Sequence, residues 1–278
     1  MDKRQIAILG LHDAAHEAAY FLDVLLDKFQ QQRYRESLNY KGTNEISHMF
    51  SAFVRSGKSI LELLAAARGE RKKSYLEQFA ASENFEFLMK TARDAITHGG
   101  VDLLAGAIQI DEERGKSWVF ICSPIVDEKG DWIQPPFQDG ISLSIDYFLA
   151  ILADVHQCYE MTETFPDEYW HGIREWEIEG MQATVHISPA MVDSAKQAQL
   201  SIPAGYVPNL INRDWIEEAR RNYQSLRSTL FPTVTVAWGK YLVEYPSYEC
   251  GEAGDLTGKV CGMKRDESGQ SATGTRIQ

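Results

Sequence analysis

The sequence has no long hydrophobic run. No stretch of its 278 residues approaches the roughly 20 consecutive apolar residues that a membrane-spanning helix needs. The first residues, Met1 to Arg4, lead into an amphipathic segment broken by Asp and His, whereas a signal peptide has an uninterrupted apolar core. These absences predict a cytoplasmic protein that has no membrane partner.

Cysteine is scarce as well. The cysteines are too few for a disulfide framework and show no paired metal-ligand spacing: Cys122, Cys158, Cys250 and Cys261. The chain also lacks a glycine-rich phosphate loop, a Gly-x-Ser-x-Gly nucleophile turn and an internal repeat. We therefore expect reduced thiols, no metal and no cofactor.

Positive charge is in short supply. The chain has 28 Lys and Arg against 40 Asp and Glu, a net charge of −12, although affinity for a phosphate backbone comes largely from Lys and Arg. The excess of acidic residues is concentrated in residues 102–168, which hold 14 acidic and three basic residues. Residues 1–100, in contrast, hold 13 acidic and 14 basic residues. This pattern argues against tight non-specific binding of nucleic acid. It is compatible with a local RNA-binding cleft in the N-terminal part.

Apolar residues at helical spacing predict an N-terminal helical bundle. The first two helices are expected at about residues 5–29 and 43–67, and a helix at about residues 142–164 completes the bundle. Gly57 lies on the apolar stripe of the second helix, where a large residue is the norm. Because glycine costs about 1 kcal/mol relative to alanine inside a helix, we expect a close helix crossing there.

Two histidines on the first helix, His12 and His16, are four positions apart and could share a metal ion. Asp13 and Glu17 follow the same spacing beside them. We interpret the four residues as a solvent-exposed polar face.

The stretch with the clearest chemistry ends a third helix, which opens near Phe85 and is stopped by Gly99 and Gly100. Its buried stripe is expected to be Phe85, Leu88, Met89, Ala92 and Ile96. Asp94 and His98 are four positions apart, so the carboxylate can orient the imidazole, and Arg93 can bring a guanidinium beside the ring. A proton carrier, an orienting carboxylate and a permanent cation suit attack at a phosphodiester.

The pattern Arg93-Asp94-x-x-x-His98 resembles the signature of the HEPN superfamily (higher eukaryotes and prokaryotes nucleotide-binding), in which an Arg precedes a His by four to six intervening positions. The order of the upstream helix, a spacer and the motif helix is also similar to that of some members, so the likeness covers about residues 1–100. It implies a helical bundle that often dimerises and, in active members, a metal-independent endoribonuclease. Some members lack activity.

In the mechanism that this resemblance implies, His98 promotes attack of a ribose 2′-hydroxyl on the adjacent phosphate. Arg93 stabilises the charge of the transition state, and Asp94 orients His98. The expected partners are an RNA substrate, a second copy in a homodimer and an antitoxin or regulatory protein, as for a toxin or an antiviral defence protein. The candidate RNA-backbone contacts are the one basic cluster, Arg68, Arg71, Lys72 and Lys73, which equally fits a solvated helix start.

Two other hypotheses remain. The chain is either a non-catalytic HEPN-like binding or scaffold protein, whose acidic surface suits a basic protein partner, or an unrelated helical protein with an accidental motif.

After Gly100 the spacing of the apolar residues changes from helical to alternating. Alternating residues at 103–110 and 117–125 predict a β-hairpin inserted into the bundle at about 102–135. We expect an α+β protein: an all-α HEPN-like unit at 1–165 carrying that insertion, a small α+β domain at 166–248, and a disordered tail at 249–278.

Overall fold

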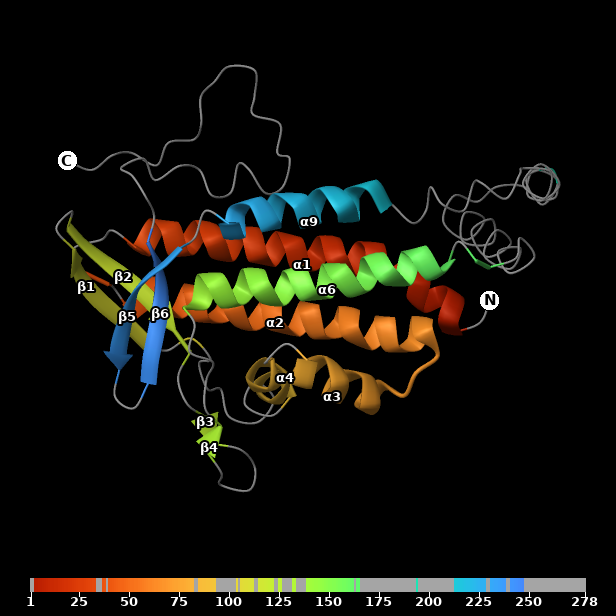
Figure 1. Cartoon of the computed structure of the whole chain (residues 1–278), viewed down its shortest axis with the longest axis horizontal. Helices are drawn as coiled ribbons and strands as arrows, with labels where there is room; N and C mark the ends of the chain where they lie inside the picture. Colours follow the sequence, from red (N-terminus) through yellow and green to blue (C-terminus); the bar gives the residue numbers. More distant parts are fainter. Residues whose placement is uncertain are drawn as a thin grey trace, which may run out of the picture.

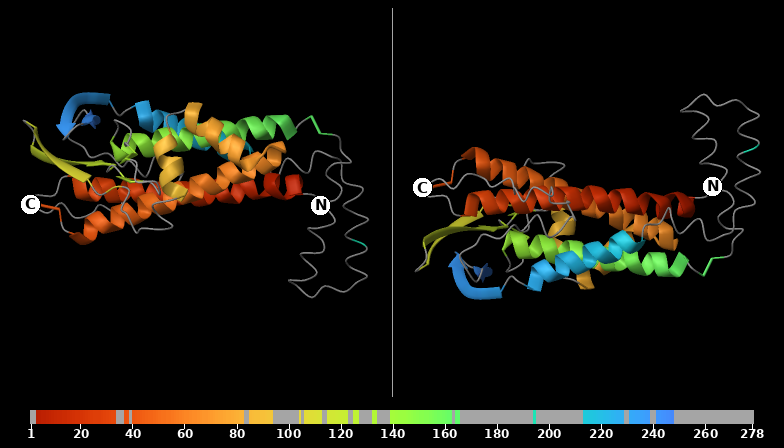
Figure 2. Two further views of the ribbon diagram at one scale, coloured as in Figure 1. Left: turned by 90° about the horizontal axis from the view of Figure 1, so that it is seen from below. Right: turned by 90° about the horizontal axis from the view of Figure 1, so that it is seen from above.

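The computed structural model describes residues 3–33, 37–38, 40–82, 85–93, 104, 106–112, 115–122, 125–126, 132–133, 139–162, 164–165, 194, 213–228, 231–238 and 241–247. Four helices lie side by side along its longest axis (Figure 1): α1 (Lys3–Arg33), α2 (Tyr40–Arg68), α6 (Gly140–Thr162) and α9 (Arg213–Ser228). The views from below and above in Figure 2 confirm this alignment.

Contacts along the bundle define the direction of each helix. The α1 and α2 helices are antiparallel, since the Nε atom of Arg4 donates to the carbonyl of Ala67 at 2.6 Å near one end, and Lys28 pairs with Glu45 at 3.0 Å near the other. The α9 helix packs antiparallel to α6, and its Arg227 forms a two-pronged ion pair with Asp146, with N···O distances of 2.7 and 3.2 Å. Such a planar pair fixes orientation as well as charge.

One apolar core runs through all four helices, and fully buried side chains come from each of them: Leu11, Leu22 and Phe29 of α1, Phe50 and Phe53 of α2, Tyr147 and Phe148 of α6, and Ile216 of α9. The ring of Tyr147 lies at its centre, where it meets the rings of Phe53, Phe79 and Phe85 edge-on at centroid distances of 5.8, 6.1 and 5.3 Å. Edge-to-face packing of this kind adds to the free energy gained by burial.

The expected close approach at Gly57 is confirmed. A Cβ atom built at this position would lie 2.6 Å from Cε1 of Tyr147 and 2.9 Å from Cδ1 of Ile151. Only a residue without a side chain therefore lets α2 and α6 pack at this distance.

Two short helices cover one side of α2: α3 (Lys72–Ser82) and α4 (Glu86–Arg93). Gly69 ends α2 with a φ of 72°, and the amides of Gly69 and Glu70 donate to the carbonyls of Ala66 and Ala65. This Schellman motif turns the chain sharply into α3.

The fold class that we expected is wrong. In the described part of the chain helices predominate, and the strands form three separate two-stranded pairs that never join into a larger sheet. These pairs are β1 (Gly106–Glu112) with β2 (Gly115–Ile121), β3 (Ile125–Val126) with β4 (Trp132–Ile133), and β5 (Phe231–Trp238) with β6 (Tyr241–Ser247). The described part of the chain is mostly helical, which contradicts the α+β class that we expected.

The physical reason for the error lies in α9. This helix was assigned to the small α+β domain, but it buries Ile216, Ala219, Tyr223 and Leu226 in the core of the bundle. Residues 166–193 and 195–212, which connect it to α6, and the expected tail at 249–278 lie outside the described residues, so the boundaries of the units stay predictions.

The packing at Gly57 generates a test. We expect Gly57→Ala to lower the free energy of unfolding by about 1–3 kcal/mol, because the new methyl group overlaps the immobile ring of Tyr147. The overlap therefore costs more free energy than the gain of about 1 kcal/mol that alanine brings in helix propensity. Gly10→Ala is the matched control, since its Cβ would meet Leu63 at an ordinary 3.5 Å. Urea unfolding of both variants measures the two changes in free energy, and equal stabilisation by the two substitutions would contradict the close packing at Gly57.

Candidate functional site

The motif begins at the C-terminal end of α4. This helix ends at Arg93, whose backbone is described, while Asp94 and His98 lie outside the described residues. Upstream, Phe85, Leu88 and Met89 are buried, as the expected stripe requires. The motif therefore starts where an anchored apolar helix ends, and a cation such as Arg93 is favoured at the negative end of a helix dipole.

The start of α4 is held from two sides. The ring of Phe85 stacks on Phe79 of α3 at 5.5 Å, and its backbone amide donates to the carbonyl of Ala80 at 3.2 Å. The same ring meets Tyr147 of α6. Through these contacts the helix that carries Arg93 is fixed to the core at its N-terminal end.

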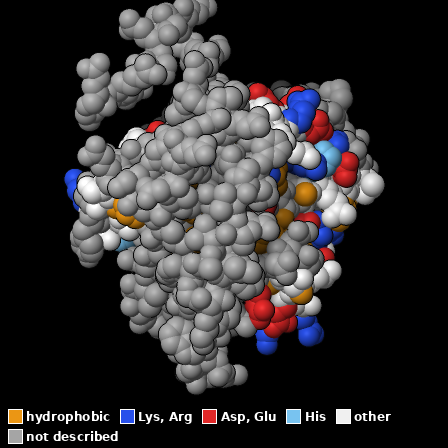
Figure 3. Space-filling model, turned by 60° about the vertical axis from the view of Figure 1, so that its left-hand side comes forward, with side chains coloured by type: hydrophobic (Ala, Val, Ile, Leu, Met, Phe, Trp, Pro, Cys, Tyr) orange, Lys and Arg blue, Asp and Glu red, His pale blue; other side chains and the backbone are white. Residues whose placement is uncertain are grey.

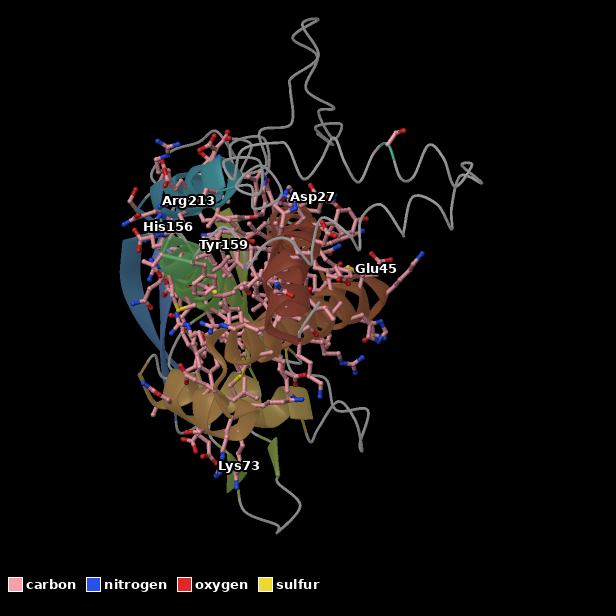
Figure 4. The ribbon with its side chains drawn as sticks, turned by 90° about the vertical axis from the view of Figure 1, so that its right-hand side faces the viewer. Asp27, Glu45, Lys73, His156, Tyr159 and Arg213 are labelled. Atoms are coloured by element: carbon pink, nitrogen blue, oxygen red, sulfur yellow. The ribbon has the colours of Figure 1, made fainter. Side chains whose placement is uncertain are left out.

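The basic cluster is largely neutralised within the chain. Arg68 pairs with Asp154 at 3.5 Å, Lys72 with Glu62 at 2.7 Å, and Lys73 more loosely with Glu77 at 3.8 Å. Arg71 is exposed at the start of α3. Figure 4 shows Lys73 at the edge of the molecule farthest from α1 and α9.

The visible surface agrees with this neutralisation. Among the coloured side chains in Figure 3, Lys and Arg lie next to Asp and Glu, and they form no continuous patch of positive charge on the part of this face that is described. A phosphate backbone binds best to a continuous basic surface. The described side chains in Figure 3 therefore provide no continuous basic surface for RNA.

A cleft of about 290 Å³ opens beside this cluster, between α2, α3 and α6. Arg68 lies on its wall, where Nη2 donates to Oε1 of Gln157 at 2.9 Å and to the carbonyl of Asp154 at 3.3 Å. The Tyr75 hydroxyl donates to the Asp154 carboxylate at 2.6 Å. Burial and the neighbouring Asp154 both raise the pKa of Tyr75, so this phenol stays protonated and acts as a hydrogen-bond donor.

Sequence reasoning found Arg68 but missed its partners. Asp154 and Gln157 are 86 and 89 residues away along the chain, and nothing in the local spacing of Tyr75 marks it as a polar contact of α6. The cleft also carries Glu70 and Asp154 against the single cation Arg68. Its charge suits a neutral or cationic polar group better than a phosphate.

A second polar contact joins α6 to α9. The Nε2 atom of His156 lies 3.3 Å from Glu217, and its Nδ1 atom lies 3.7 Å from Glu160 on its own helix. His156 therefore joins α6 to α9. Within the described residues, no three His, Cys, Asp or Glu side chains converge as metal ligands.

A buried carboxyl group connects α1 to α9. Asp23 is only 8% exposed and accepts a hydrogen bond from the hydroxyl of Tyr223 at 3.0 Å. Burial raises the pKa of Asp23 from 3.8 to about 7, and the bond from Tyr223 opposes part of that change. Near neutral pH this group is thus divided between its charged and uncharged forms.

No known protein family, no curated protein and no solved structure matches the chain. No helix in the described ranges is long and apolar enough to cross a membrane.

The pKa of Asp23 predicts how stability depends on pH. Because the folded state holds this proton up to about pH 7 and the unfolded state loses it near 3.8, the folded state binds more protons in between, and stability falls as pH rises through that window. The shift corresponds to at most about 4 kcal/mol. We expect Asp23→Asn to abolish this slope and to stabilise the protein at pH 8 by about 1–3 kcal/mol.

Urea unfolding at pH 5 and pH 8 measures this effect. Asp27→Asn is the control, since Asp27 lies on the same helix at a half-exposed position and bonds to the Gln31 amide at 2.5 Å. If Asp23→Asn destabilises the protein equally at both pH values, the carboxyl group is charged in the folded state throughout, and the assignment fails.

Proposed function

We propose that the protein is a metal-independent endoribonuclease of the HEPN type. The observation that carries the proposal is the position of the motif Arg93-Asp94-x-x-x-His98, which starts on the last residue of an anchored amphipathic helix in a helical bundle. Phe85, Phe87, Leu88 and Met89, at and after the start of that helix, are buried, which anchors the helix upstream of the motif.

The chemistry follows from the residue types. His98 takes the proton of a ribose 2′-hydroxyl as that oxygen attacks the adjacent phosphate. The bond from phosphorus to the 5′-oxygen breaks, which leaves a 2′,3′-cyclic phosphate and a 5′-hydroxyl that takes its proton from solvent. Arg93 stabilises the negative charge that builds up on the phosphoryl oxygens. Asp94 holds the imidazole in the tautomer that accepts the proton.

The reaction needs no metal because the strand is cut by its own hydroxyl group. A magnesium site requires several converging oxygen ligands, whereas the motif contributes one carboxylate, Asp94. Cleavage in EDTA is therefore part of the proposal. A cytoplasmic toxin or defence protein, held in check by an antitoxin or regulatory protein, is the biological setting that fits such an activity.

The ion pairs of the basic cluster favour a second candidate function. Arg68, Lys72 and Lys73 each face a carboxylate of the same chain, which engages three of the four cations of the basic cluster. A non-catalytic HEPN-like scaffold that binds a basic protein partner would need no such cations. Wild-type protein without any ribonuclease activity would support this function.

We expect His98→Ala and Arg93→Ala each to lower RNA cleavage by about 10² or more, since they remove the proton carrier and the charge-stabilising cation. Asp94→Asn should do less harm, because an amide oxygen still accepts a hydrogen bond from the ring. Cleavage of structured RNA in EDTA is the measurement, and His48→Ala, at an exposed position of α2, is the control.

Thermal melting of the same variants separates catalysis from structure. Cleavage that stops in EDTA and returns with magnesium would refute the metal-independent mechanism. Variants that lose stability while the wild type shows no cleavage would assign Arg93 and His98 a structural role.

We also expect a homodimer in which the two motif segments face each other. One Arg and one His are few groups for in-line phosphoryl chemistry, and a two-fold axis doubles them in one cleft. Light scattering at micromolar concentration measures the mass, expected at twice the 31.5 kDa of one chain. A monomer with full ribonuclease activity would contradict this arrangement.

A further inference from the structure

Two histidines of α1 come together on the side of the bundle that faces α9. The Nε2 atoms of His12 and His16, on consecutive turns, lie 3.0 Å apart. The indole of Trp215 in α9 stacks on His16, with centroids 3.7 Å apart and an interplanar angle of 25°, and it meets His12 edge-on at 5.9 Å. The exposed polar face expected from the sequence is confirmed for Asp13, His16 and Glu17, and α9 in addition places the indole of Trp215 against both rings.

The two rings are joined to each other and to Asp13. Oδ1 of Asp13 lies 3.3 Å from Nδ1 of His12, and a hydrogen bond joins Nε2 of His12 to Nε2 of His16, with the donor set by the tautomers of the rings. A carboxylate behind one histidine is also the usual outer partner of a metal-binding imidazole, because it orients the ring and strengthens it as a ligand.

We propose that His12 and His16 form a binding site for a divalent first-row transition-metal ion, with preference for Ni(II) or Cu(II) over Zn(II). Imidazole nitrogens bind such ions at about 2.0–2.1 Å. At that distance, two nitrogens 3.0 Å apart subtend an angle of about 90–100° at the metal. This is close to the right angle of square-planar and octahedral sites and narrower than the tetrahedral angle that zinc prefers.

Binding requires one rearrangement of protons. The proton of the Nε2···Nε2 hydrogen bond moves to an Nδ1 atom through solvent, so that both Nε2 lone pairs point at the metal. No oxidant or reductant takes part.

The site is open to solvent. His16 is exposed and the His12 side chain retains 24% exposure, so an ion can reach both nitrogens. Because no third His, Cys, Asp or Glu of the described chain converges there, water fills the remaining coordination positions. Such positions are free to exchange water for a ligand from solution or from another protein.

Isothermal titration calorimetry with Ni(II) alone on the full chain tests the proposal. Removing an outer partner of a metal site costs about 10- to 100-fold in affinity, so loss of a ligand in His12→Ala or His16→Ala should weaken one Ni(II) site by about 10² or more. Asp13→Asn should weaken it less. His48→Ala, at an exposed position of α2, should bind as the wild type does.

Trp215 provides an independent signal. Ni(II) should quench part of the tryptophan fluorescence of the wild type, and that part should be absent in Trp215→Phe and in His16→Ala. His12→Gln and His16→Gln replace the alanine variants if circular dichroism shows that those unfold. Equal Ni(II) affinity in the wild type and the histidine variants, no Ni(II) binding by the wild type, or tighter binding of Zn(II) than of Ni(II) would each overturn the proposal.

Discussion

The ring of Tyr147 lies against Gly57, and most of the described fold depends on this contact. It sets the distance between α2 and α6, and a methyl group at Gly57 would already overlap the ring. The same ring supports Phe79 and Phe85, which fix α3 and the start of α4. Because packed aromatic groups cannot shift independently, the segment that carries the motif takes its position from the centre of the bundle.

Charge places a second constraint on the molecule. Three members of the basic cluster, Arg68, Lys72 and Lys73, are engaged with carboxylates of α6, α2 and α3, and the Arg68 guanidinium also lies 5.5 Å from the centroid of the Tyr75 ring. Any RNA phosphate that reached Arg68 would have to replace Asp154 and break these contacts. An enzyme built in this way would depend on Arg93, and on a second copy of it, more than on broad electrostatic attraction.

The sequence predicted the helices better than their partners. The apolar stripe expected on α2 is almost entirely buried. The helical spacing of apolar residues is by itself enough to identify the buried face of a long helix. The first helix extends beyond its predicted end, since Gln32 and Arg33 are polar but buried there, and Gln32 packs on Gly42 of α2. Tertiary contact overrides local composition at such a position.

The limits of sequence reasoning have a common physical origin. A stripe such as Ile216, Ala219, Tyr223 and Leu226 indicates that one face of α9 is buried, but it carries no information about what covers that face. The same is true of Arg68, whose partners are far away along the chain, and of His16, whose indole partner lies on another helix. The motif at Arg93 was readable because its residues are neighbours in sequence.

The helix α9 differs from the other bundle helices in how it is held. Its apolar stripe is flanked by polar contacts at Asp23, Asp146 and His156, and burial raises the pKa of Asp23 to about 7. The contact between α2 and α6 at Tyr147 is almost purely apolar and does not respond to pH. Because burying the charged form of Asp23 opposes folding, whereas burying Tyr147 favours it, α9 is the helix whose docking responds most to its surroundings. Both rings of the two-histidine site contact Trp215 of this helix, so a metal ion bound there would act at the most adjustable contact of the bundle.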